Sequence, residues 1–201
     1  LTLRSVAGGN GELDCHLISI ADGGNSHGML IVEGEGTTLR LGNDPATINV
    51  GPVGVGLMTL TDGATMTTAK LVLGQNQSGA RGELLIDNGA TLNVGIQLTI
   101  ENNSKATVMG GGTVVSEPAS IGILVNHGGR LRGEGVVDAD VRNYGVVETL
   151  IGQPLHVLKN YFQPAPSTLA FSGSLTAGIS GPSTWSSMHS DKEAYIAGLL
   201  D

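Results

Sequence analysis

The most constraining feature of this chain is a pair of similar segments, residues 56–74 (GLMTLTDGATMTTAKLVLG) and residues 82–100 (GELLIDNGATLNVGIQLTI). In each segment, apolar residues at alternate positions lead into a polar turn that contains Asp-Gly or Asn-Gly, and a second alternating run follows. A period of two predicts strands that bury one face and expose the other. The turn glycine supplies the positive φ that a tight corner needs. Each segment therefore predicts two strands joined by a corner.

Looser copies of this unit flank the pair and give the chain a repeat of twenty-odd residues. A unit this short cannot bury its own apolar face, so its copies must stack on one another. The spacing predicts a solenoid of parallel strands rather than an ordinary globular domain. The predicted corner glycines are separated by 27, 26, 23 and 23 residues, and they are Gly36, Gly63, Gly89, Gly112 and Gly135.

A second, shorter spacing appears downstream, where Asn126, Asn143 and Asn160 follow one another at intervals of 17 residues. Asparagine tolerates the left-handed backbone conformation, and amide side chains stacked on successive coils can hydrogen-bond in a ladder. We therefore predict that these asparagines occupy one corner of successive coils, and that the coils tighten towards the C-terminal side.

The composition of the chain changes near its end, where the six aromatic residues lie from residue 144 onward and four of the seven prolines gather. We predict solenoid repeats over residues 1–165 and a small capping or assembly segment over residues 166–201. Ser190 and Glu193 stand at capping-box spacing before an apolar stripe, which favours a short helix. The alternative is an extended segment that pairs with a neighbouring subunit. The stripe consists of Tyr195, Ile196, Leu199 and Leu200.

Composition and charge exclude several classes of protein. An apolar share of 40% with only 3% aromatic residues excludes disorder and fits a narrow core of Leu, Val and Ile. The net charge is −8 and the ten basic residues are scattered along the sequence, so nucleic acid is not expected as a partner. No run approaches the roughly 18 apolar residues of a membrane helix. Residues 1–11 lack the apolar core of an export signal, and the lone Cys15 cannot form an internal disulfide.

Few residues are candidates for chemistry. Asp138 and Asp140 alternate in VDADV and should point to one face, where they would bind a cation or a sugar or simply be solvated. Asp62 and Asp87 precede corner glycines and are predicted to be turn residues. Trp185 and Tyr195 are predicted either to stack on a sugar ring or to close the last coil.

The remaining polar residues indicate no catalytic site, metal or cofactor. The five histidines lack metal-ligand spacing. Alternating threonines in the first segment suggest a flat hydroxyl face, but the second segment does not repeat them, so no ordered lattice is predicted. The threonines are Thr59, Thr61, Thr65, Thr67 and Thr68, and the corresponding residues are Leu85, Asp87, Thr91, Asn93 and Val94.

The two segments resemble the repeats shared by type V autotransporter passengers and by exported bacterial proteins that carry a PEP-CTERM sorting tail. A second match is LRGEGVVDADVRNYGVVETL followed by LHVLKNYFQPAPSTLAF, so the resemblance covers roughly residues 28–171. It implies a right-handed parallel β-helix outside the cytoplasm, on a bacterial cell surface or secreted. The family has no shared active site to transfer to this chain.

These observations together predict an extracellular, non-enzymatic structural or adhesive β-solenoid. The expected partners are further copies of the same chain, joined head to tail in a filament or surface lattice, and cell-surface glycans. Two alternatives share the fold. One is a carbohydrate-active β-helix, either a polysaccharide lyase or a tailspike-like depolymerase, and the other is a glycan-binding module.

Overall fold

The computed structural model describes residues 2–4, 16–41, 46–75, 77–150 and 154–164, together with the backbone of four short strands between residues 168 and 200. These residues form strands β1 to β22 and contain no helix. A helix long and apolar enough to cross a membrane is accordingly not found among them.

The strands pair in parallel in two sheets. Sheet A has nine strands, and each of its members except the first begins a new coil of the chain. In order across the sheet, its strands are β1 (Thr2–Arg4), β3 (His27–Glu33), β6 (Val55–Thr61), β8 (Arg81–Ile86), β10 (Lys105–Val108), β13 (Arg130–Gly133), β16 (Val146–Thr149), β19 (Thr168–Ala170) and β22 (Leu199–Leu200).

Sheet B has thirteen strands and divides into two faces. The division arises because each of two long strands, β7 (Thr65–Leu73) and β9 (Thr91–Ile100), pairs with one short strand along its first half and with a different short strand along its second half. Face B1 consists of β4 (Thr38–Arg40), the first halves of β7 and β9, β11 (Thr113–Ser116), β14 (Val136–Asp138), β17 (Leu155–Val157) and β20 (Met188–Ser190). Face B2 consists of β2 (Leu17–Ile20), β5 (Thr47–Val50), the second halves of β7 and β9, β12 (Gly122–Val125), β15 (Val141–Asn143), β18 (Tyr161–Gln163) and β21 (Ala194–Ile196).

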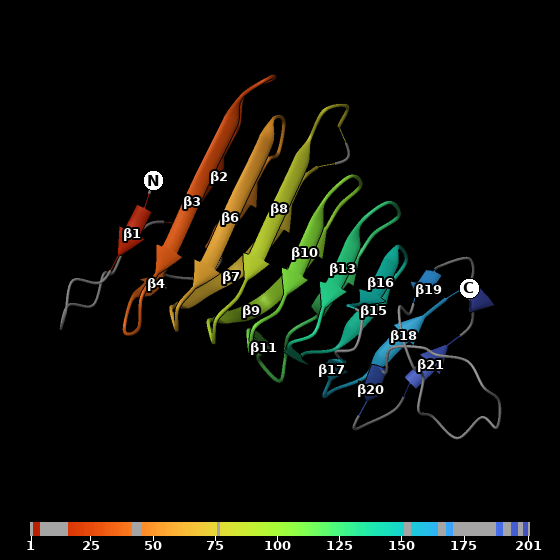
Figure 1. The fold of residues 1–201 in the computed structure, drawn as a ribbon. Helices are drawn as coiled ribbons and strands as arrows, with labels where there is room; N and C mark the ends of the chain where they lie inside the picture. The colour runs from red at the N-terminus through yellow and green to blue at the C-terminus, as the bar shows by residue number, and fades with distance from the viewer. Residues whose placement is uncertain are drawn as a thin grey trace.

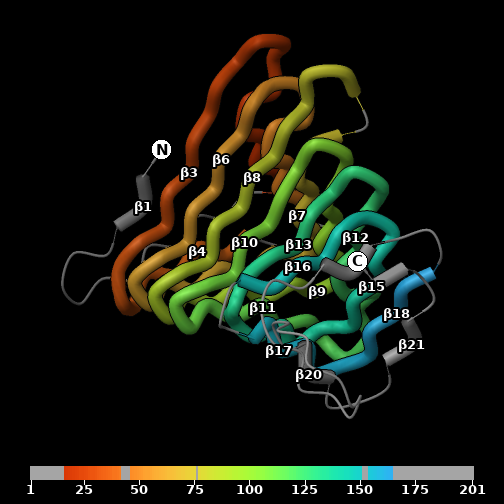
Figure 2. The backbone as a smooth tube through the Cα atoms, turned by 45° about the vertical axis from the view of Figure 1, so that its right-hand side comes forward, coloured from red at the N-terminus to blue at the C-terminus, as the bar shows by residue number. Residues whose placement is uncertain are grey.

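Each coil passes along sheet A, then B1, then B2. Figure 1 shows the chain descending along sheet A in front, returning along sheet B behind and advancing from left to right, which is a right-handed winding. The turned view in Figure 2 shows the coils stacked side by side. Right-handed crossovers are the rule between parallel strands. The predicted right-handed parallel β-helix is confirmed.

The alternating residues of each strand build a continuous aliphatic core between the sheets. In sheet A, Leu30, Met58, Leu84, Ala106 and Leu131 lie opposite one another on successive strands, and all are buried. Burial of a large aliphatic side chain contributes about 1.5–3 kcal/mol. Most of the stability of the coil therefore comes from rows that run across strands, which no single repeat can form alone.

The corners between sheet A and face B1 explain three of the five predicted glycines. Gly36, Gly63 and Gly89 have φ values of +78°, +76° and +74°. Asp62 and Asn88 immediately before two of them are also left-handed, with φ of +57° and +48°. Glycine adopts this conformation freely, and Asp and Asn tolerate it better than other residues, which explains the residue types at these corners. Asp62 is thus a turn residue, as predicted.

The other two predicted corner glycines, Gly112 and Gly135, are corrected by the structure. The left-handed corner residue of the next coil is Gly111, with φ of +78°, and Gly112 follows it. A Cβ on Gly112 would lie 2.6 Å from the carbonyl oxygen of Ile86, and one on Gly135 would lie 2.5 Å from the carbonyl oxygen of Gly112. These two positions need glycine because backbones approach closely, whereas the first three need it for positive φ.

The predicted asparagine ladder is wrong. Asn143 lies opposite Val125 rather than opposite Asn126, and the side chain of Asn160 hydrogen-bonds to Asp140. The coils in this region contain unequal numbers of residues. A constant interval in the sequence therefore does not place residues on top of one another.

The predicted C-terminal helix is also wrong, because β20, β21 and β22 are extended and pair in parallel with β17, β18 and β19. A helix of two turns is marginal by itself, whereas added strands continue existing ladders. Ser190 ends β20, and the apolar stripe lies in β21 and β22. The pairing continues past residue 165 and involves the preceding coil of the same chain. Trp185 lies outside the described residues.

Candidate functional site

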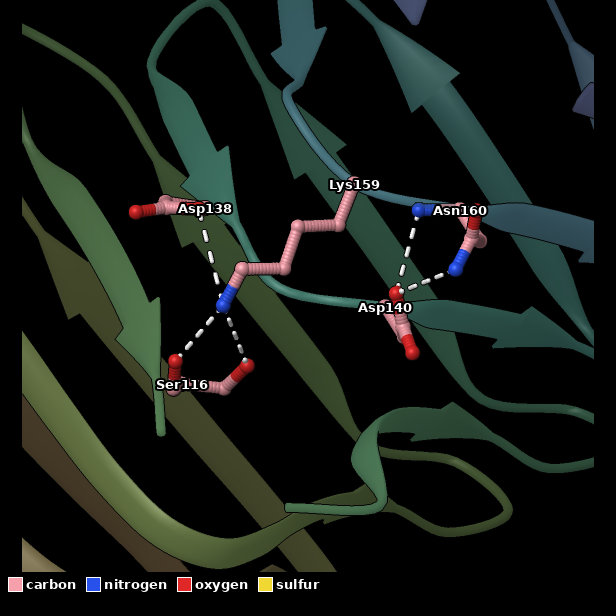
Figure 3. Close-up of polar contacts among 5 residues, drawn as sticks. All are labelled: Ser116, Asp138, Asp140, Lys159 and Asn160. Carbon is pink, nitrogen blue, oxygen red and sulfur yellow. Dashed lines mark hydrogen bonds and ion pairs between the residues drawn. The ribbon is translucent and has the colours of Figure 1, made fainter. Parts of the chain in front are cut away.

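The predicted carboxylates lie on the outside of the coil, Asp138 at the end of β14 and Asp140 just before β15, with the buried Ala139 between them. Figure 3 shows that the two groups have different partners. Asp138 Oδ1 lies 3.6 Å from Lys159 Nζ. Asp140 Oδ1 accepts two hydrogen bonds of 3.1 Å, from the backbone N–H and the side-chain amide of Asn160.

Lys159 links three coils through this cluster. Its chain position lies between β17 and β18, yet its ammonium donates to the carbonyl oxygen of Ser116 at 2.7 Å and approaches Ser116 Oγ at 3.4 Å. Ser116 ends β11 and Asp138 ends β14, so one side chain contacts two preceding coils (Figure 3). Because this side chain is only 24% exposed, its charge is partly desolvated and needs these oxygens.

The surface beside Lys159 is a shallow depression of about 340 Å³, which Ser116, Glu117, Asp140 and Asn160 help to line. Asp138 and Asp140 do point to one side of the strand, as the alternation predicts. Each is engaged with a neighbouring coil, so the arrangement acts chemically as a cross-link between coils and not as a pair of convergent carboxylates.

A buried polar network inside the coil was not predicted from the sequence. Tyr161 is completely buried, and its hydroxyl accepts a hydrogen bond from Asn143 Nδ2 at 3.0 Å and donates one to Gln163 Oε1 at 2.8 Å. Asn143 Oδ1 accepts from the N–H of Gly145 at 3.0 Å. Burial raises the pKa of Tyr161 far above its ordinary value, although the hydrogen bond from Asn143 acts in the opposite direction. The hydroxyl is therefore a fixed neutral bridge.

A row of threonines on the outside of face B1 appears only when the register is known. Thr38, Thr65, Thr91 and Thr113 lie opposite one another on four neighbouring strands. The sequence comparison of two segments had predicted no ordered lattice of hydroxyls. The row is one residue wide, because the next outward position holds, in the same order, Arg40, Thr67, Asn93 and Val115.

The basic residues are less scattered than the sequence suggested, because four of the ten gather on the outer side of sheet A. We call this surface the cationic face. It is formed by Arg81 on β8, Lys105 on β10, Arg130 and Arg132 on β13, with Glu83 on β8 and Glu148 on β16 among them.

Ion pairs within the cationic face connect its residues across strands. Glu83 pairs with Arg81 and, at 3.0 Å, with Lys105. Partial burial by itself raises the pKa of the Glu83 carboxyl, but the hydrogen bonds and charges of Lys105 and Arg81 outweigh it and hold the pKa below its ordinary value. Arg130 Nη1 and Arg132 Nε each lie 3.8 Å from an oxygen of Glu148. Two carboxylates thus hold four cations in place.

The described histidines do not form a group of three potential metal ligands. His127 lies near Tyr144, with ring centroids 6.4 Å apart, and His156 lies opposite His189 in sheet B. Within the described ranges, no three side chains of His, Cys, Asp or Glu are close enough to hold a metal ion.

Comparison of the chain with known proteins yields no match to a family model, a curated protein or a solved structure.

Proposed function

We propose that this chain is a non-enzymatic structural or adhesive β-solenoid that acts outside the cell. The observation that carries the proposal is the parallel register of sheet A, which runs across nine strands over a continuous aliphatic core. Such a body is elongated, and its outer faces present rows of side chains about 4.8 Å apart. This architecture suits spacing, display and repeated weak contacts.

The extracellular location is supported by the resemblance of residues 28–171 to repeats of autotransporter passengers and PEP-CTERM proteins. We propose a bacterial cell surface or the surrounding medium as its place of action.

Self-association is the second part of the proposal. All described strands of sheet A pair in parallel with their neighbours and stack in one direction along the coil. Unpaired N–H and C=O groups on an edge strand are a template for another strand. A second copy of the chain offers a parallel edge with the same strand spacing, and repeated pairing of unlike ends would produce a filament.

Light scattering after size exclusion, combined with electron microscopy over a range of protein concentrations, tests this assembly. We expect rods whose length increases in whole multiples of one particle. Particles that stay monomeric at every concentration would contradict the assembly.

Incubation with polyuronates is the second test: release of new chain ends, abolished by Asp138→Asn, would overturn the non-enzymatic assignment.

A further inference from the structure

We propose that the cationic face binds an acidic polysaccharide, a polymer that carries a carboxylate or sulfate on most of its sugar units. This inference deepens the adhesive part of the proposed function and rests on it. It is independent of self-association, because a monomeric rod presents the same surface.

The first argument is the arrangement of the charges. Glu83, Lys105 and Arg130 lie opposite one another on β8, β10 and β13, and these strands are direct neighbours in sheet A (Figure 1). Parallel strands are about 4.8 Å apart. Lys105 and Arg130 therefore place cations on successive steps of a ladder, and Arg132 adds a third two residues along β13. A linear polymer with an acid on each unit can contact several of them at once.

The second argument is that the basic groups remain accessible and have donors to spare. The side chains of Arg81, Lys105, Arg130 and Arg132 are 53%, 38%, 57% and 38% exposed. The separation of 3.8 Å between Glu148 and both guanidinium groups of β13 exceeds the 2.7–2.9 Å of a charge-assisted hydrogen bond. Arg130 and Arg132 are thus positioned by Glu148 without being saturated by it.

The third argument is local charge. The cationic face holds four of the ten basic residues of the chain and only two of its eighteen acidic residues, while the whole chain has a net charge of −8. At physiological ionic strength, charges are screened within about 8 Å. An anionic ligand close to sheet A consequently responds to the local positive excess and not to the net negative charge.

The fourth argument distinguishes a sugar polymer from nucleic acid. The cationic face borders a depression of about 380 Å³, to which Asn102, Asn103 and Ser104 contribute. The amide groups and the two glutamates offer hydrogen-bonding partners for sugar hydroxyls. The residues that line the depression include no aromatic side chain on which a base could stack.

Binding of the full chain to four probes tests the proposal: polygalacturonate for carboxylates, dextran sulfate for sulfates, unmodified dextran as the neutral control, and single-stranded DNA. We expect binding to at least one of the first two, weakened by added salt. The double variant Arg130→Gln/Arg132→Gln should weaken it about tenfold, since two exposed charge contacts are lost. The matched control Arg40→Gln/Arg142→Gln removes the same charge from exposed residues of sheet B and should change affinity less than twofold.

A variant of opposite sign makes the test sharper. Glu148→Gln removes a negative charge beside both guanidinium groups and should tighten binding of the acidic probe several-fold, whereas Glu35→Gln, in an exposed turn, should leave it unchanged.

Three results would overturn the inference. They are no binding of either acidic polymer at low salt, equal losses in the two arginine double variants, or binding of DNA as tight as that of the polysaccharides. Failure of assembly leaves the inference standing, and failure of this binding leaves self-association standing.

Discussion

Replacement of Gly82 by alanine tests how closely successive coils approach where the chain returns to sheet A. Gly28, Gly56 and Gly82 lie opposite one another on β3, β6 and β8. A Cβ on Gly82 would lie 2.3 Å from the carbonyl oxygen of Val50 and 2.4 Å from the amide nitrogen of Gly74. Both contacts are backbone atoms at the end of face B2, so neither can rotate away as the end of a side chain does.

The expected cost follows from this geometry. Overpacking a close-packed interior costs typically 1–3 kcal/mol and sometimes more. Because backbone from two different coils surrounds Gly82, we expect Gly82→Ala to lower the free energy of unfolding by about 3 kcal/mol. Urea denaturation followed by circular dichroism measures the change as a lower transition midpoint, and the slope of the transition reports whether the coil still unfolds as one unit.

Gly95 provides the matched control on β9, the next strand along the chain. Its added Cβ would meet nothing closer than Ala69 Cα at 3.6 Å, an ordinary contact. Gly95→Ala should therefore be neutral or raise the free energy of unfolding by about 0.4–1 kcal/mol, because alanine restricts the unfolded chain. A midpoint for Gly82→Ala equal to that of the unmodified chain, or a larger loss for Gly95→Ala, would refute the reasoning from close approach.

Two further predictions concern the polar contacts between coils. Tyr161→Phe removes the hydroxyl that connects Asn143 to the neighbouring strand and should cost about 1–3 kcal/mol in urea denaturation. Since folding raises the pKa of Tyr161, the free energy of unfolding should be constant below about pH 10 and fall as the pH rises above it. In an ultraviolet titration Tyr161 should ionise only when the chain unfolds. Ionisation of Tyr161 in the folded chain would contradict its burial. Lys159→Met should lower the free energy of unfolding by about 1 kcal/mol, because the links to Asp138 and Ser116 are lost from a partly exposed site. In hydrogen exchange the loosening should be confined to the amides of β11, β14, β17 and β18, and uniform loosening of the coil would contradict a local cross-link.

Much of the fold was predictable because its determinants are local. The alternation of apolar and polar residues in residues 56–74 and 82–100 specifies strands with one buried face, and the buried rows of β6 and β8 follow it residue by residue. Gly63 and Gly89 were identifiable as corners because a left-handed turn has a recognisable dipeptide. The stacked parallel coil then follows, since a unit of this size has no other way to cover its apolar face.

The surfaces of the protein depended instead on register, which only the tertiary structure decides. Residues 56–74 and 82–100 align in the sequence, but later coils differ in length, so equal spacing of Asn126, Asn143 and Asn160 did not produce a ladder. For the same reason Glu83, Lys105 and Arg130 are distant in the sequence yet lie opposite one another on three neighbouring strands. Adding or removing residues at a corner changes which side chains lie opposite one another without changing the alternation along a strand. The sequence by itself therefore determined what is inside the coil, while the lengths of the folded corners decided which outward groups meet.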